Sequence, residues 1–236
     1  MILRSLIEHV RTQNWLAVGL DFLIVVLGVF IGIQVSNWND RLADKSREIH
    51  ALELLLTEAE NHVAYSELII YRAGKLQRDR EAAEAMLRGA DPDEGDPVHG
   101  LSVMPVFRDM TPIDAAHDAL TASGDINLIG SPEVRSALSL FNGVVIFHDR
   151  MRAEYIDRAP DIMEMASPYM TLRYAPDNSL GYVARVDWAA AGRDRSLVNA
   201  VAQVMGDQIV FSERRAIILE NAQLLCEALA AELGKP

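Results

Sequence analysis

The amino-acid sequence predicts an all-α protein, in which one N-terminal transmembrane helix continues into an extramembrane antiparallel helical bundle. Three observations lead to this fold class. An apolar run covers residues 16–35, a helical repeat follows it with no proline before Pro92, and a second helical repeat fills residues 194–233. Together they predict an interfacial amphipathic helix over residues 1–14, a transmembrane helix over 15–38 and an acidic helical domain over 39–236.

The apolar run from Leu16 to Val35 has the length of a membrane span. Only Asp21 and Gln34 interrupt its twenty residues, and a spanning helix needs about 20. Trp15 and Trp38 flank it roughly 35 Å apart along a helix, as interfacial anchors do. A cleaved signal peptide is the alternative, but the run exceeds its usual length of about 7 to 15 residues and lacks an A-x-A-like cleavage site. An uncleaved signal anchor fits better.

The segment before the run has the pattern of a short helix lying in the membrane interface. Apolar side chains recur at helical spacing while the charged ones take the other face. A frayed polar tail is the alternative. The apolar positions are Ile2, Leu3, Leu6, Ile7 and Val10, and the charged positions are Arg4, Glu8 and Arg11.

Basic residues on both sides of the run leave its orientation open. Arg4 and Arg11 precede it, whereas Arg41, Lys45 and Arg47 follow it. The segment before the run is short, and signal anchors commonly translocate a long acidic part. We therefore expect a cytoplasmic N-terminus and a C-terminal domain on the outer side.

The excess negative charge lies beyond the apolar run. The sequence has 34 acidic and 22 basic side chains, a formal net charge of −12, and residues 1–36 hold two of each sign. An acidic domain repels phosphate backbones and anionic headgroups, which argues against nucleic acid as a partner. Cys226 is the only cysteine, so an intrachain disulfide and a cysteine-rich zinc cluster are excluded.

The acidic domain is expected to contain two long helices and shorter ones between them. The first seam alternates in steps of three and four. A loop over 89–110 follows, then a helix over 111–123 with Pro112 in its first turn and Gly124 as its stop. Ser131 and Pro132 begin another helix, and an irregular region over 168–193 is expected to be a loop or a short strand pair packed by Trp188. The first seam consists of Ile49, Leu52, Leu56, Ala59, Val63, Ser66, Ile70 and Ala73.

The stretch AVGLDFLIVVLGVFIGIQVSNWND resembles the N-terminal signature of a family of uncharacterised bacterial single-pass membrane proteins, with the pattern G-E-I-L-L-V-V-x-G-I-x-I-A-L-Q-x-N-N-W-N-E. The resemblance implies a helical domain of unknown function, anchored in the bacterial inner membrane and, with the orientation above, periplasmic. Leu20, Gly32 and Ser36 depart from the pattern. The matching positions are Asp21, Gly28, Gln34, Asn37, Trp38 and Asn39.

No catalytic motif is found, so the sequence predicts neither an enzyme nor a cofactor. The strongest metal-like constellation pairs Glu58 with His62 and Asp114 with His117, because a helical bundle can direct such pairs inward at a di-metal centre. Solvated helix residues are the favoured interpretation, and no metal is expected. Asn61 is either a buried residue that fixes helix register or an exposed one.

Four residues inside the apolar run form one stripe. Asp21, Gly28, Gly32 and Ser36 follow one another at steps of seven, four and four, which places them on one helix face. Gly28 and Gly32 form a GxxxG pair that allows a second helix to approach closely. A snorkelling Asp21 beside incidental glycines is the alternative.

The leading functional hypothesis is a membrane-anchored structural or interaction protein, either an accessory subunit of a larger membrane complex or a homo-oligomer. Its partners would be the lipid bilayer and a membrane protein, or a second copy of the chain, bound through the transmembrane helix. The first alternative is an extracytoplasmic ligand-binding sensor. The second is a metal-binding bundle enzyme.

Overall fold

The computed structural model describes residues 15–108, 110, 115–177 and 182–235. The described chain is helical apart from turns, connectors and one two-stranded sheet, so the all-α fold class is confirmed. It divides into two units, residues 1–50 and 51–236. The interfacial helix expected over residues 1–14 lies outside the described residues.

The described residues of the first unit form the initial part of helix α2 (Trp15–Leu87). An 18-residue window of this part has a mean hydropathy of 2.1, and none of the window is buried. The helix is therefore long and apolar enough to cross a membrane, as the sequence predicts. It does not end at Trp38, because it continues without a break into the second unit.

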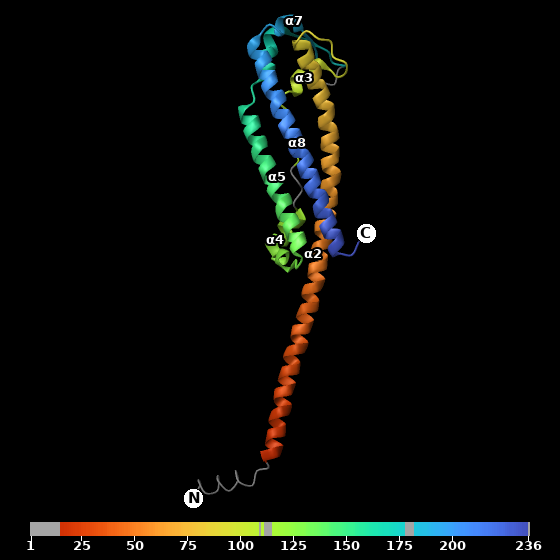
Figure 1. The fold of residues 1–236 in the computed structure, drawn as a ribbon, viewed down its shortest axis with the longest axis vertical. Helices are drawn as coiled ribbons and strands as arrows, with labels where there is room; N and C mark the ends of the chain where they lie inside the picture. The colour runs from red at the N-terminus through yellow and green to blue at the C-terminus, as the bar shows by residue number, and fades with distance from the viewer. Residues whose placement is uncertain (1–14, 109, 111–114, 178–181, 236) are drawn as a thin grey trace. The chain divides into compact units, whose positions relative to one another are not determined.

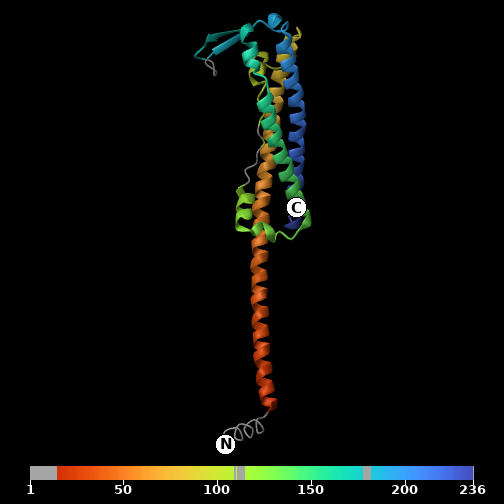
Figure 2. The same ribbon diagram turned by 90° about the vertical axis from the view of Figure 1, so that its left-hand side faces the viewer.

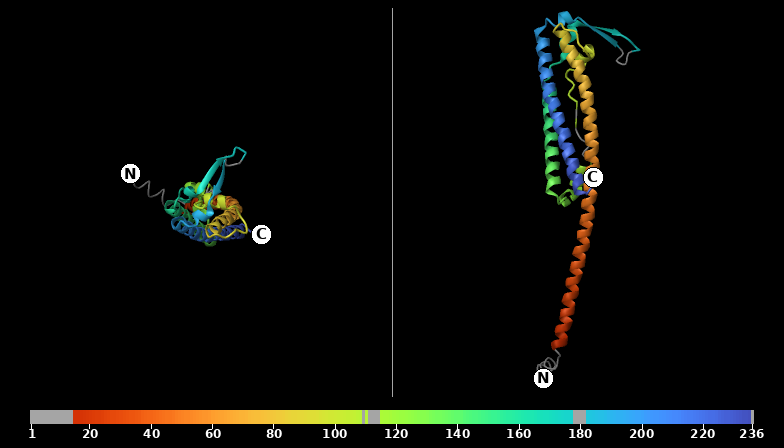
Figure 3. Two further views of the ribbon diagram at one scale, coloured as in Figure 1. Left: turned by 90° about the horizontal axis from the view of Figure 1, so that it is seen from above. Right: turned by 45° about the vertical axis from the view of Figure 1, so that its right-hand side comes forward.

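Three long helices form the frame of the second unit: the remainder of α2, α5 (Pro132–Arg158) and α8 (Arg195–Glu232). Figures 1 and 3 show them side by side. One core cluster joins the beginnings of the α2 segment and of α5 to the end of α8, and a second cluster joins the opposite ends. Helix α8 is thus antiparallel to the other two, whereas α5 runs parallel to α2.

The parallel orientation of α5 follows from the path between α2 and α5. This path contains α3 (Pro97–Val103), α4 (Ala115–Ser123) and the 3₁₀ turn η1 (Asp125–Leu128). The described part of the connector after α3 lies in the interior, because Met104 and Met110 are fully buried and Phe107 is nearly so. The chain thereby returns along the bundle before α5 begins.

The segment expected as a loop over 89–110 therefore contains a helix. Asp96 caps α3 by accepting hydrogen bonds from the backbone N–H groups of Val98 and His99, and Pro97 occupies its first position. Helix α4 is described from Ala115, since residues 111–114 lie outside the described residues. Gly124 follows α4 with a φ of 82°, which confirms the predicted left-handed stop.

The predicted starts of the later long helices are confirmed. Ser131 precedes α5 and accepts a hydrogen bond from the Val134 N–H group, while Pro132 occupies the first helical position. Asp194 caps α8 in the same way. Buried side chains then follow the helical period along both helices.

The irregular region over 168–193 contains the expected strand pair. It follows α6 (Ile162–Ala166) and the turn η2 (Ser167–Tyr169). Strands β1 (Met170–Tyr174) and β2 (Tyr182–Val186) are antiparallel, and helix α7 (Trp188–Ala191) follows. Trp188 packs against the second core cluster. The hairpin extends away from the long helices in Figures 2 and 3.

We expect residues 40–236 to form a soluble helical protein when they are expressed alone. The second unit has its own two hydrophobic clusters, and the apolar window is removed with the first part of α2. A far-ultraviolet circular-dichroism spectrum measures this directly. A spectrum dominated by strand or by unfolded chain contradicts the prediction.

Candidate functional sites

The intramembrane stripe predicted from the sequence lies on the unburied part of α2. Asp21, Gly28, Gly32 and Ser36 are all exposed within the described residues. A Cβ atom added at either glycine would meet no atom within 4 Å, so this face is open to another helix. Trp38 is also exposed, and Trp15 is the first residue of α2.

Three of the four residues in the metal-like constellation come together in the second unit. Glu58 and His62 on α2 and His117 on α4 line a cavity of about 10 Å³ together with Asn142 on α5. Asp114 lies outside the described residues. A cavity of this size holds about one water molecule.

The described residues of the constellation join helices to one another. Glu58 accepts hydrogen bonds from the backbone N–H groups of Ala116, at 2.6 Å, and His117, at 3.3 Å. It therefore caps the N-terminus of α4 from a different helix, where a negative charge is stabilising. Asn142 Nδ2 lies 3.2 Å from His117 Nε2. No group of three or more His, Cys, Asp or Glu side chains among the described residues has the arrangement of a metal site.

His62 is a neutral core residue beside this cap. Its ring meets the edge of Phe141 at a centroid distance of 4.9 Å, and its side chain is almost fully buried. Burial lowers the pKa of His62, and this outweighs the raising effect of the residue's own backbone. Neither ring nitrogen has a hydrogen-bond partner on another described residue. The small cavity beside it has a mainly apolar lining and room for about one water molecule.

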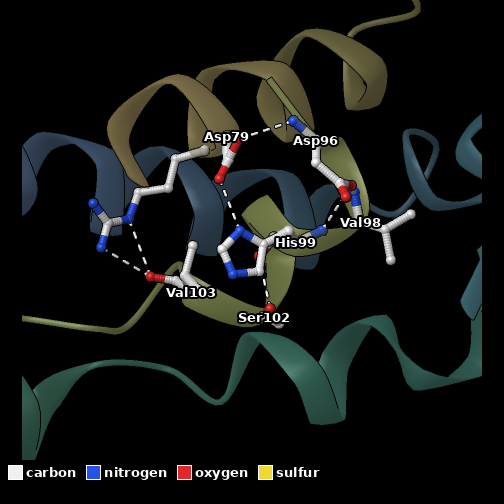
Figure 4. Close-up of polar contacts among 7 residues, drawn as sticks. Asp79, Asp96, Val98, His99, Ser102 and Val103 are labelled. Atoms are coloured by element: carbon white, nitrogen blue, oxygen red, sulfur yellow. Dashed lines mark hydrogen bonds and ion pairs between the residues drawn. The ribbon is translucent and has the colours of Figure 1, made fainter. Parts of the chain in front are cut away.

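A second polar cluster, which the sequence interpretation missed, fixes α3 to α2 (Figure 4). Asp79 on α2 accepts hydrogen bonds from the Asp96 N–H group at 2.9 Å and from His99 Nδ1 at 2.8 Å. Gly100 allows the close approach, because a Cβ atom there would lie 1.9 Å from the backbone oxygen of Asp79. The carboxylate and the glycine together determine where α3 lies.

Buried polar side chains also hold the connector after α3. Arg80 donates to the carbonyl oxygen of Val103 from Nε and Nη2, at 3.1 and 2.9 Å, and to that of Val106 at 2.7 Å. Gln208 on α8 donates to the carbonyl oxygens of Met104 and Val106, both at 3.2 Å. These bonds satisfy backbone acceptors that no helix or sheet pairs.

The three-four alternation of the helices contained a signal for these buried residues. On α2 the buried series Ser66, Ile69, Ala73, Leu76 and Arg80 follows steps of three and four, and Arg80 is only 2% exposed, whereas the predicted seam departs from burial at Ile49, which is 42% exposed. On α8 the buried series includes Gln208 and Arg215 at the same spacing as its apolar members. A charged or amide side chain at the spacing of an apolar seam therefore indicates a buried position.

The Asp79 cluster predicts a dependence of stability on pH. Burial by itself raises the pKa of Asp79, but the Asp96 and His99 hydrogen bonds and nearby positive charge outweigh it and lower the pKa below its ordinary value of 3.8. A carboxyl group with a lowered pKa contributes stability above pH 3.8 and loses it as the pH falls through the folded-state pKa.

We therefore expect Asp79→Asn to destabilise the protein at pH 7, and we expect the difference to shrink as the pH falls below 3.8 toward the lowered folded-state pKa of Asp79. Chemical unfolding of both proteins across this pH range measures the difference. An unchanged gap between the two proteins from pH 7 to pH 3 contradicts the role of the carboxylate. Asp177→Asn, which changes an exposed carboxylate, is the matched control.

We compared the chain with known families, curated proteins and solved structures. No protein-family model, no curated protein and no solved structure matches the chain.

Proposed function

We propose that the protein is a membrane-anchored helical structural or interaction protein, working as an accessory subunit of a larger membrane complex or as a homo-oligomer. The observation that carries the proposal is the exposure of the apolar window on α2. Its largest side chains range from Val26, 45% exposed, to Phe22, 71% exposed, and no described part of the chain covers them. Such a surface is stable in a lipid bilayer and not in water.

The proposal places the anchor in a bacterial inner membrane, with a single pass and a periplasmic C-terminal domain. Support for the organism class and the membrane comes from the resemblance of residues 17–40 to the bacterial single-pass signature. The proposed orientation follows the behaviour of signal anchors, which commonly translocate a long acidic part. The proposal assigns no catalytic reaction and no cofactor to the chain.

The contact to a partner is proposed to run through Asp21, Gly28, Gly32 and Ser36. The two glycines allow close helix packing, and Asp21, if it met lipid while charged, would cost up to about 3 kcal/mol. Both properties favour burying this face against protein, either a second copy of the chain or another membrane protein.

Substitution of the glycines tests this interface. We expect Gly28→Ile with Gly32→Ile to abolish association, because bulky side chains separate the helix backbones, and Asp21→Leu to weaken it modestly. An in-membrane dimerisation reporter measures self-association, and co-purification measures a foreign partner. Each variant must remain in the membrane fraction after carbonate washing for the comparison to be valid.

The matched control is Val26→Ile with Phe30→Ile, which places the same residue type, also four positions apart, on the opposite face of the helix. It should associate as the unmodified protein does. If the double glycine variant associates as the unmodified protein does in both assays, this face is not an interface. Release of the full-length protein by carbonate would contradict the membrane anchor itself.

A ligand-binding sensor is the second candidate, and one observation favours it. An open groove of about 470 Å³ lies between the first half of α5 and the last half of α8, with Leu140 and Leu224 beside the polar side chains of Ser136 and Asn221. Its volume falls in the range of small-molecule sites, although the groove is open to solvent. Native mass spectrometry of the membrane-extracted protein reports bound ligands and protein partners in one measurement. A bound small molecule without a protein partner would favour the sensor.

A further inference from the structure

Three arginine side chains gather where the connector after α3 passes between α2 and α8. Arg80 on α2 and Arg215 on α8 are 2% and 3% exposed, and Arg108 of the connector is partly buried. Val106 accepts hydrogen bonds from both Arg80 and Gln208, which brings α2 and α8 to the same point of the connector. The next residue, Phe107, contacts the ring of Phe211. The guanidinium of Arg215 covers that ring at 4.7 Å from its centroid.

The positive charge of this cluster is not balanced by the carboxylates of the described residues. Arg80 is bonded to backbone carbonyl groups, and its acidic neighbour Asp79 already accepts hydrogen bonds from Asp96 and His99. The Nε–H groups of Arg108 and Arg215 are buried and have no hydrogen-bond partner among the described residues. Burial of a charge without a counter-charge, and of a donor without an acceptor, is strongly unfavourable.

The pKa values of Arg80 and Arg215 reflect this arrangement of buried positive charges. Burial, and then the positive charges of Arg215 and Arg108, lower the pKa of Arg80 to about 10, and the negative charge of Asp79 opposes them only in part. Burial, and then the charge of Arg108, lower the pKa of Arg215 to about 10. Both groups remain charged at neutral pH, so the cluster holds like charges at short range in a chain whose net charge is −12.

We propose that the cluster of Arg80, Arg108 and Arg215 is a binding site for a small tetrahedral oxyanion, inorganic phosphate or sulfate, which receives the unpartnered Nε–H groups of Arg108 and Arg215. Guanidinium groups suit this ligand because their donors match the geometry of such oxygens. Arg108 is only partly buried, which gives the ligand a side of approach from solvent. Binding would tie the connector to α8 and so restrain the segment that follows α3.

Titration of the full-length chain in a neutral detergent tests the proposal. Thermal unfolding is measured as sodium phosphate or sodium sulfate replaces sodium chloride at constant ionic strength. A specific site gives a saturating stabilisation, and an anion concentration ten times the dissociation constant shifts the folding equilibrium about 11-fold. Exclusion of these anions from the protein surface instead gives a stabilisation that keeps increasing with anion concentration. Stabilisation without saturation contradicts the proposed site.

Three substitutions locate the effect. Arg215→Gln and Arg108→Gln should each abolish the saturating component, whereas Arg150→Gln, which removes an exposed arginine of α5, should retain it. If Arg215→Gln does not fold, Arg108→Gln decides, because its side chain is less buried. A saturating response of wild-type size in Arg108→Gln overturns the site. Saturating stabilisation that appears only in Asp109→Asn also contradicts the site, because Asp109 would then be the counter-charge in the unmodified chain.

Discussion

Replacing Gly100 with alanine is expected to lower the free energy of unfolding by about 3 kcal/mol, because the added methyl group has no space. It would lie 1.9 Å from the backbone oxygen of Asp79 and 3.0 Å from the Cβ atom of Ala83, both on α2. A helix backbone cannot move aside as a flexible side chain can. Helix α3 must therefore separate from α2, which also stretches the hydrogen bonds that Asp79 receives from Asp96 and His99.

The control for this prediction is Gly143→Ala on α5, where an added Cβ atom meets nothing within 4 Å. Alanine there should raise stability by about 0.5 to 1 kcal/mol, because glycine is unfavourable inside a helix. Urea unfolding of the full-length chain in detergent measures both variants. Equal stability of Gly100→Ala and the unmodified protein would show that α3 does not lie against the α2 backbone.

The second large effect is expected at Phe211, the centre of the aromatic group in the second core cluster. The side chain is fully buried, and its ring lies 4.3 Å from that of His148, 5.4 Å from that of Phe107 and 6.0 Å from that of Tyr155, measured between centroids. Phe211→Ala should destabilise the protein by about 3 to 5 kcal/mol through lost burial and the cavity left behind. It also removes the ring beneath the guanidinium of Arg215.

Phe147→Ala on α5 provides the matched control. The Phe147 side chain is 46% exposed, and Arg214 lies over its ring at 5.3 Å. Its loss should cost less than about 1 kcal/mol, because little apolar surface returns to water. Chemical unfolding compares the two variants under one condition. Similar losses at both positions would place Phe211 outside the core.

The elements that the sequence predicted are those whose causes are local. The apolar run, the helical period of α2 and α8, and the starts of α5 and α8 at Ser131 and Asp194 each depend on residues within a few positions of one another. The Gly124 stop is of the same kind, because only the backbone conformation at that residue decides it.

The expectation of a loop over 89–110 was wrong in one respect, because the helix in this segment depends on contacts with distant residues. Proline, glycine and acidic residues are typical of solvent loops, yet Asp96 and Pro97 are also a helix start, and α3 follows them. Its stability depends on Asp79 and Gly100, whose contact joins positions far apart in the chain. A pattern within the segment cannot report such a contact.

The sequence by itself determined the helical class, the apolar helix and its open stripe at Asp21, Gly28, Gly32 and Ser36, because composition and period act residue by residue. Only the tertiary structure decided that α5 runs parallel to α2, that Glu58 caps α4, and that Arg80 and Arg215 lie inside the bundle. These features arise when segments far apart in sequence become neighbours. Burial and hydrogen bonding then give a charged side chain a role that its own sequence neighbourhood does not specify.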